Sequence, residues 1–321
     1  MGQSQNMISP DTICHPEPVE GYYLDKEMNK KKINIPFIKQ LFISILIINS
    51  VQLLADKIEL KPGVQTLCLP KDASVVTLTL PPCTNRIPVD VYTPEDKKVV
   101  ADVLVLNGWS FPRDDWQKKT RILKSGKEKG FRLIFPEMGK TNYESDYFPE
   151  TKLKWSTTPG GKWVREILIP SFQQNGILVK GGKNFVMGLS TGGRGAAILG
   201  YTKPDIFSAA ASISGDFDQA TMPKDRLMTG SYGSYEENKE RWETVDNVHR
   251  NAKDWKIPIY LGHGQADKIS PFIQTKNFYL KLKELHPNLK MIFNDPKDAE
   301  HDYKYWDSEV DPIFQFFSSI K

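Results

Sequence analysis

NFVMGLSTGGRGAA, residues 184–197, is the stretch that decides the fold of this chain. It opens with a short apolar run, passes through Gly-x-Ser-x-Gly, and continues into small residues that favour a helix. A strand that turns sharply into a helix at such a motif holds its serine hydroxyl above the sheet. The backbone of such a turn is strained, and a side chain at position 188 or 192 would collide with the neighbouring strand or helix. Glycine is therefore expected at both positions. The stretch predicts Ser190 as a nucleophile; the alternative is a serine in a glycine-rich turn.

The rest of the composition is that of an ordinary globular protein. The chain has 321 residues, which suffices for one large α/β domain or two small ones. Its formal net charge of +4 is small for this length. Since no basic cluster with interleaved aromatic residues is present, the sequence gives no support for nucleic-acid binding.

The N-terminal residues predict export. Residues 1–27 are polar and contain three prolines without periodicity, so we interpret them as a non-structured upstream extension, with Met28 as the true start. Residues 28–55 combine Lys30–Lys32, an apolar core at 41–48 and a terminal Ala55, the layout of a signal peptide. An uncleaved anchor is the alternative. We expect a mature domain at 56–321, periplasmic or secreted, with no stable membrane association after cleavage.

Export changes the interpretation of the cysteines. Cys14 precedes the signal segment and would be lost, which leaves Cys68 and Cys83 on two neighbouring strand-like runs. In an oxidising compartment these two are expected to form a disulfide. Two free buried thiols are the alternative, and the spacing is not that of a metal site.

Periodicity predicts a sheet with two parts. From 64 to 91 short β-rich runs alternate with turn residues, which favours antiparallel strands, clearest at 74–80 and 87–92. From 99 onward strands alternate with helices, the pattern of βαβ units in a mostly parallel sheet. The expected strands are 100–106, 131–135, 185–189, 208–214, 257–261 and 290–293, and the expected helices are 114–129, 163–173, 271–285 and 303–320.

A serine nucleophile needs a base beside it and an acid that orients the base. Asp267 follows the 257–261 strand, at the strand end where open α/β sheets build their sites. His301 follows the last strand and is the one histidine of five in the required position. We therefore predict His301 as base and Asp267 as its partner. Asp267 could instead cap the next helix, and Asp295 and Asp298 are the weaker alternative acids.

The oxyanion of the tetrahedral intermediate needs backbone donors. Thr191 N–H lies at the start of the elbow helix, and Trp109 N–H lies in the loop after an earlier strand, where Gly108 lets the backbone turn. Trp109 could instead cap the sheet or line the pocket. Arg113 and Arg194 fall near these loops and are interpreted as solvated or ion-paired.

With these residues assembled, the chain resembles the α/β-hydrolases, and most of all the esterase group that includes esterase D, S-formylglutathione hydrolase, feruloyl esterases and mycolyltransferases. The resemblance runs from about residue 87 to the C-terminus. It rests on the segments 106–109, 188–193, 207–215, 232–238 and 262–264, on Asp267, and on His301 with Tyr305 and Trp306. One departure is Asn107, where these enzymes often carry a histidine. The resemblance implies an α/β-hydrolase fold, a serine triad and no cofactor.

Function is then expected to be exported carboxylester hydrolysis. An insertion at 216–256 is charged and aromatic rather than apolar, which favours a small or medium soluble ester over a lipid surface. A serine peptidase or an acyltransferase with the same triad is the alternative within enzymes. A non-catalytic binding protein on the same fold is the alternative outside them.

Overall fold

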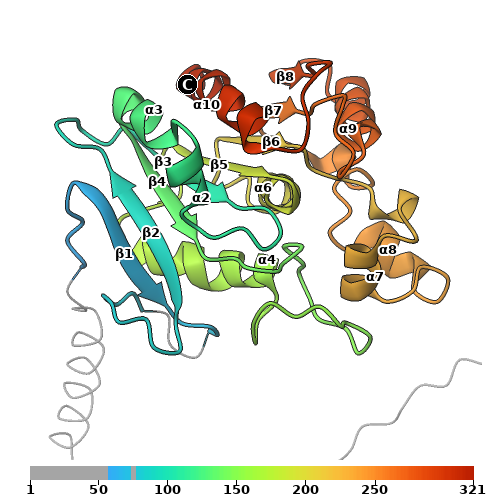
Figure 1. Cartoon of the computed structure of the whole chain (residues 1–321), viewed down its shortest axis with the longest axis horizontal. Helices are drawn as coiled ribbons and strands as arrows, with labels where there is room; N and C mark the ends of the chain where they lie inside the picture. Colours follow the sequence, from blue (N-terminus) through green and yellow to red (C-terminus); the bar gives the residue numbers. More distant parts are fainter. Residues whose placement is uncertain (1–56, 74–76) are drawn as a thin grey trace, which may run out of the picture. The chain divides into compact units, whose positions relative to one another are not determined.

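The computed structural model describes residues 57–73 and 77–321, and the compact unit that holds them spans Asp56–Lys321. The extension predicted at 1–27 and the signal segment predicted at 28–55 lie outside the described residues. At the centre is an eight-stranded sheet with the order β1-β2-β4-β3-β5-β6-β7-β8 (Figure 1). The strands are β1 (Gly63–Leu69), β2 (Ile87–Thr93), β3 (Ala101–Leu106), β4 (Phe131–Pro136), β5 (Asn184–Leu189), β6 (Ala209–Ile213), β7 (Ile259–Gly262) and β8 (Met291–Asn294).

The pairing confirms the predicted fold class. β1 is antiparallel to β2, and β2 is antiparallel to β4. The six strands from β3 to β8 all pair in parallel. Helices cover both faces: α2 (Asp115–Lys119), α3 (Ile122–Lys129), α4 (Gly160–Trp163), the π-helical turn η1 (Val164–Leu168), α5 (Ile169–Gln174), α6 (Thr191–Thr202), α9 (Phe272–Leu285) and α10 (Tyr303–Ser318).

Side-chain alternation along the strands divides the core in two. Every residue of β3 and β5 is buried, as expected for parallel strands covered on both faces. Val103 and Val105 pack on the side of α2, α3 and α10, whereas Leu104 and Leu106 pack on the side of η1, α5, α6 and α9. This alternation follows from the two-residue period of a strand, and it keeps the sheet rigid beneath its carboxyl edge.

Three sequence predictions need correction. The helix expected at 114–129 is broken at Thr120, whose backbone is extended. The Thr120 hydroxyl donates to Trp116 O at 2.6 Å, beside the Thr120 N–H at 3.2 Å, and accepts from Ile122 N–H at 3.2 Å. The side chain therefore takes up the N–H that would otherwise continue the helix. The predicted helix at 163–173 is longer than expected, because helical turns run from Gly160 to Gln174.

The strand expected at 74–80 is the third correction. Residues 74–76 lie outside the described residues, and 77–80 form no strand; a single antiparallel bridge joins Thr79 to Cys68. Pro81 and Pro82 follow directly, and proline has no N–H to extend a ladder. The bridge therefore stays isolated beside β1.

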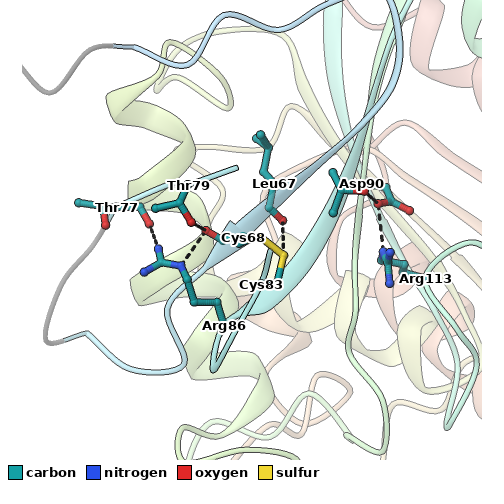
Figure 2. The surroundings of a disulfide bond; sticks show 9 residues. Leu67, Cys68, Thr77, Thr79, Cys83, Arg86, Asp90 and Arg113 are labelled. Carbon is teal, nitrogen blue, oxygen red and sulfur yellow. Dashed lines mark hydrogen bonds and ion pairs between the residues drawn. A yellow bond between two sulfur atoms is a disulfide. The ribbon is translucent and has the colours of Figure 1, made fainter. Parts of the chain in front are cut away.

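A disulfide joins Cys68 to Cys83, as predicted, with the two Cα atoms 5.2 Å apart. Figure 2 shows it at the end of β1, beside the Arg86 side chain. Arg86 Nε donates to Cys68 O at 3.1 Å, and its Nη2 donates to Thr77 O. The disulfide and the Arg86 hydrogen bonds therefore tie residues 77–86 to the end of β1.

Replacing both cysteines by serine should lower the free energy of unfolding by about 3 kcal/mol, because the closed loop spans 15 residues. Chemical denaturation of the oxidised protein and the double variant measures the difference. Non-reducing mass spectrometry of the natively purified protein should find no free thiol at these positions. Equal stability of the two proteins would contradict the structural role of the bond.

Candidate active site

Ser190 lies where β5 passes into α6, at the carboxyl edge of the sheet. Its backbone has φ 53° and ψ −125°, a region that non-glycine residues rarely adopt. The Ser190 N–H donates to Ile213 O at 2.8 Å, which anchors the strained residue to the end of β6. The side chain is half-buried, so the hydroxyl is held rigidly and is still reachable.

The glycines of the elbow make this turn possible. A Cβ on Gly188 would lie 2.2 Å from Gly192 O, and one on Gly192 would lie 2.4 Å from Leu106 O. Both distances are far below contact with backbone atoms that cannot move aside. Strand β3, strand β5 and helix α6 therefore meet too closely at this point for any side chain.

Asp267 and His301 are brought together by two loops that pair through their backbones. The loop after β7 donates from His263 N to Asn294 O, from Gln265 N to Pro296 O and from Ala266 N to Ala299 O, all within 2.9–3.1 Å. Gly264 permits the crossing, since a Cβ there would lie 2.1 Å from Ala299 O. As a result His301 Nδ1 lies 2.7 Å from Asp267 Oδ2, across 34 residues of sequence.

The environment of Asp267 keeps it ionised. Its side chain is fully buried, and Oδ1 accepts from the N–H groups of Ile269 and Ser270 at 2.8 and 2.9 Å. Burial opposes ionisation, but hydrogen bonds from His263 and His301 outweigh it and hold the pKa of Asp267 well below its usual range. A buried carboxylate of this kind can orient a histidine and stabilise its protonated form. Asp295, a weaker alternative acid, instead accepts from Gln265 Nε2 at 3.0 Å.

A series of contacts connects His301 to the end of β6, where the Ser190 backbone is anchored. The Trp306 ring lies edge-on to the His301 ring with centroids 5.1 Å apart, and Trp306 Nε1 donates to Ser214 Oγ at 3.2 Å. Ser214 directly follows Ile213, the residue that accepts from Ser190 N–H. With only 9% of its side chain exposed, His301 is held between the acid loop and helix α10.

The predicted oxyanion loop lies against the nucleophile. A Cβ on Gly108 would lie 3.1 Å from Ser190 Cβ, which places the backbone before Trp109 beside the serine. Asn107 occupies the position where the similar enzymes often carry histidine. It is buried and donates from Nδ2 to Pro112 O at 2.6 Å. The hydroxyl of Tyr143 donates to Asn107 O at 2.8 Å. Asn107 therefore braces this loop from below rather than facing the substrate side.

The two arginines near the site are ion-paired. Arg113 Nε lies 3.0 Å from Asp90, at the far side of the sheet from α6. Arg194 is fully buried in α6, with Nη1 2.7 Å from Asp216 Oδ1. Its Nη2 donates to Gln219 Oε1 and Tyr232 OH, both at 3.1 Å, and to Asp246 O at 3.2 Å. One guanidinium thus fastens the segment between β6 and β7 to the elbow helix.

That segment carries two short helices, α7 (Arg226–Tyr232) and α8 (Lys239–Thr244), and the single turns η2 (Gln219–Thr221) and η3 (Ala252–Asp254). Met228, Tyr232 and Trp242 form a small separate core within it. Sequence patterns could not show that Arg194 reaches this core, because its partners lie 22 to 52 residues downstream. In the sequence, only the position of Arg194 within the elbow motif indicated that it lies near the site.

No helix among the described residues is both long and apolar enough to cross a membrane. The candidate site residues lie in loops at the carboxyl edge of the parallel strands. A strained serine after β5, a buried acid after β7 and a histidine after β8 follow the order of the α/β-hydrolase serine enzymes.

The fold and this site define a serine hydrolase of the α/β-hydrolase class. Within it, the Esterase family model, described as "Putative esterase", matches residues 83–317, and the chain belongs to this family. A diacylglycerol acyltransferase/mycolyltransferase, Ag85B of Mycolicibacterium smegmatis, is 22% identical over 61% of this chain and 69% of its own length.

Solved structures show the same fold. The fluorophosphonate-binding serine hydrolase FphF of Staphylococcus aureus superposes with a TM-score of 0.61 at 18% identity, over 81% of this chain and 100% of that one. An S-formylglutathione hydrolase from Agrobacterium tumefaciens gives 0.62 at 14% identity, over 82% and 97%. Membership of the esterase family confirms the predicted class of enzyme, and these structures confirm its fold.

Replacing Arg194 by leucine should lower the free energy of unfolding by about 3–5 kcal/mol, because Asp216 would be left buried without its cation. Arg250→Leu is the matched control: Arg250 also contacts an aspartate of this segment, Asp218 at 3.2 Å, but its side chain is 48% exposed. The control should cost at most about 1 kcal/mol. Equal losses in the two variants, measured by denaturation, would show that burial of Arg194 is not what matters.

Proposed function

We propose that this chain is an exported carboxylester hydrolase that cleaves a small or medium soluble ester through an acyl-enzyme on Ser190. The observation that carries the proposal is the 2.7 Å contact between His301 Nδ1 and the buried Asp267 carboxylate. A histidine held this way presents its Nε2 as a base, and an elbow serine is the group that such a base activates.

In the first half-reaction Ser190 Oγ attacks the ester carbonyl carbon, and His301 Nε2 takes the hydroxyl proton. The carbonyl oxygen becomes an oxyanion, which accepts hydrogen bonds from the N–H groups of Trp109 and Thr191. Collapse of this intermediate breaks the bond to the alcohol, which leaves with the proton from His301. Asp267 stabilises the imidazolium during both transfers.

In the second half-reaction water replaces the alcohol. His301 removes a proton from water as the water oxygen attacks the acyl carbon. The second intermediate collapses to a carboxylic acid, and His301 returns the proton to Ser190 Oγ, which restores the free hydroxyl. No cofactor takes part in this sequence. If an acceptor alcohol takes the place of water, the same steps produce a new ester.

The segment 216–256 supports a soluble substrate. All of it is described, and it presents no exposed large hydrophobic side chain, whereas Lys239 and Glu240 are exposed. Arg194 also ties the segment to α6. The segment therefore lacks the exposed apolar surface and the freedom to open that a lid acting at a lipid surface needs.

Acyl transfer is the second candidate, and the similarity to the mycolyltransferase of Mycolicibacterium smegmatis favours it. Both reactions share the acyl-enzyme and differ in the acceptor. Products formed from p-nitrophenyl butyrate with and without added glycerol separate them: free butyrate alone indicates hydrolysis, and a glyceryl ester that dominates in dilute glycerol indicates transfer.

Ser190→Ala and His301→Ala should each abolish turnover of p-nitrophenyl butyrate, because the two groups act as one unit. Asp267→Asn should lower kcat by about 10⁴-fold, as loss of the orienting acid does in the serine-protease template. The melting temperature of Ser190→Ala should hardly change. Near-normal turnover of His301→Ala would show that the base is assigned to the wrong residue.

Backbone donors provide the control for these side-chain variants. Thr191→Ala keeps its N–H and should keep much of the activity. Gly108→Val should lose it, since the added atoms would displace the loop from Ser190. The reverse order of the two variants would contradict the oxyanion assignment.

Export is supported by the pattern of residues 28–55 and by the Cys68–Cys83 disulfide, a bond that persists in oxidising compartments. We expect the mature protein to begin near Asp56. N-terminal sequencing of protein recovered outside the cytoplasm measures this directly. An intact Met1 or Met28 on protein that stays in the cytosol would overturn the localisation.

A further inference from the structure

A second histidine contacts the carboxylate of Asp267. His263 is fully buried, and its Nε2 lies 3.2 Å from Asp267 Oδ2, the same oxygen that faces His301. Asp267 is thus shared between two imidazoles, of which only His301 is placed to meet a substrate.

The partners of His263 determine which nitrogen carries its proton. Nε2 faces two acceptors, Asp267 Oδ2 and Ser270 O, the second at 3.1 Å. A lone pair on Nε2 would repel both oxygens, so Nε2 must carry a hydrogen. Nδ1 lies 2.6 Å from Thr275 Oγ1, and a threonine hydroxyl can either donate to that nitrogen or accept from it.

The surroundings of Thr275 favour a neutral ring. If the Thr275 hydroxyl donates to Gly215 O, 3.3 Å away, Nδ1 must also be protonated and the ring becomes a buried cation. If the hydroxyl donates to Nδ1, at the shorter distance of 2.6 Å, the ring is neutral with its hydrogen on Nε2. The shorter contact and the lower cost of burying a neutral ring both select the second arrangement.

We propose that His263 is a positioning residue of the active site: its Nε2–H fixes the Asp267 carboxylate in the orientation that His301 requires. The Thr275 hydroxyl determines that the hydrogen is on Nε2, and burial keeps the ring in place. Asp267 then has four donors, the N–H groups of Ile269 and Ser270 on Oδ1 and the two histidines on Oδ2. The Phe272 ring lies edge-on to His263, with centroids 5.9 Å apart, and limits its rotation. This proposal rests on the catalytic roles of Ser190, His301 and Asp267 proposed above.

If the proposal is correct, turnover depends on the N–H group that His263 offers to Asp267 and not on the imidazole ring itself. His263→Leu removes the N–H and should lower kcat by about 10- to 100-fold with little change in KM, because a small misplacement of a catalytic group costs this much. His263→Gln places an amide N–H near the position of Nε2 and should recover most of the loss. Steady-state kinetics on p-nitrophenyl butyrate measures both variants, with melting temperatures as the check on folding.

A double-mutant cycle distinguishes positioning from a general loss of stability. If His263 acts through Asp267, His263→Leu should cause no further loss of kcat in the Asp267→Asn background. The same fold-loss in both backgrounds, or wild-type kcat in His263→Leu, would overturn the proposal. Should Ser190→Ala retain turnover, the triad itself would fail, a result that the His263 variants cannot produce.

A measurement on the unaltered chain covers the case in which His263→Leu does not fold. In ¹⁵N-histidine-labelled protein at neutral pH, the His263 signal, identified by its loss in His263→Gln, should show a protonated Nε2 and an unprotonated Nδ1. An unprotonated Nε2 would contradict the proposal whatever the activity of the variants.

Discussion

The site depends on the backbone pairing of two loops at the carboxyl edge of the sheet. The N–H groups of the loop after β7 donate to carbonyl groups at the end of β8 and in the loop after it, and Gly264 lets the two loops approach without a side chain between them. That pairing brings Asp267 and His301 to 2.7 Å, and it needs β7 and β8 to be adjacent and parallel. The order of the strands in the sheet therefore defines the fold and also determines that Asp267 and His301 can meet.

The same edge solves a second geometrical problem, which is to hold a serine in a strained conformation. The energy stored at Ser190, of order 1–3 kcal/mol, is offset by close packing between β3, β5 and α6. The N–H of Ser190 is bonded to β6, and the guanidinium of Arg194, one turn further along α6, ties the helix to the segment beyond β6. Helix α6 thus holds both Ser190 and the segment after β6 in place.

Much of this could be predicted from the sequence, and the exceptions have physical causes. Ser190, Asp267 and His301 could be proposed from the sequence because each follows a recognisable strand in a fixed order. Thr120 could not be recognised as a helix break, since its hydroxyl competes with the backbone only in the folded geometry. The strand expected at 74–80 was overestimated because β-propensity ignores the prolines that follow. The contacts of Arg194 depend on partners 22 to 52 residues downstream, and no spacing encodes them. His263 lies only four residues before Asp267, so its proximity to the acid could be expected from the sequence.

The central claim is that Ser190 is the nucleophile activated by the Asp267–His301 pair. It is tested most directly by labelling the protein with a fluorophosphonate probe and mapping the modified peptide by mass spectrometry. The account predicts one adduct on Ser190, formed rapidly in the unaltered protein and lost in His301→Ala although Ser190 remains. An adduct on a different residue, or undiminished labelling of Ser190 in His301→Ala, would contradict it.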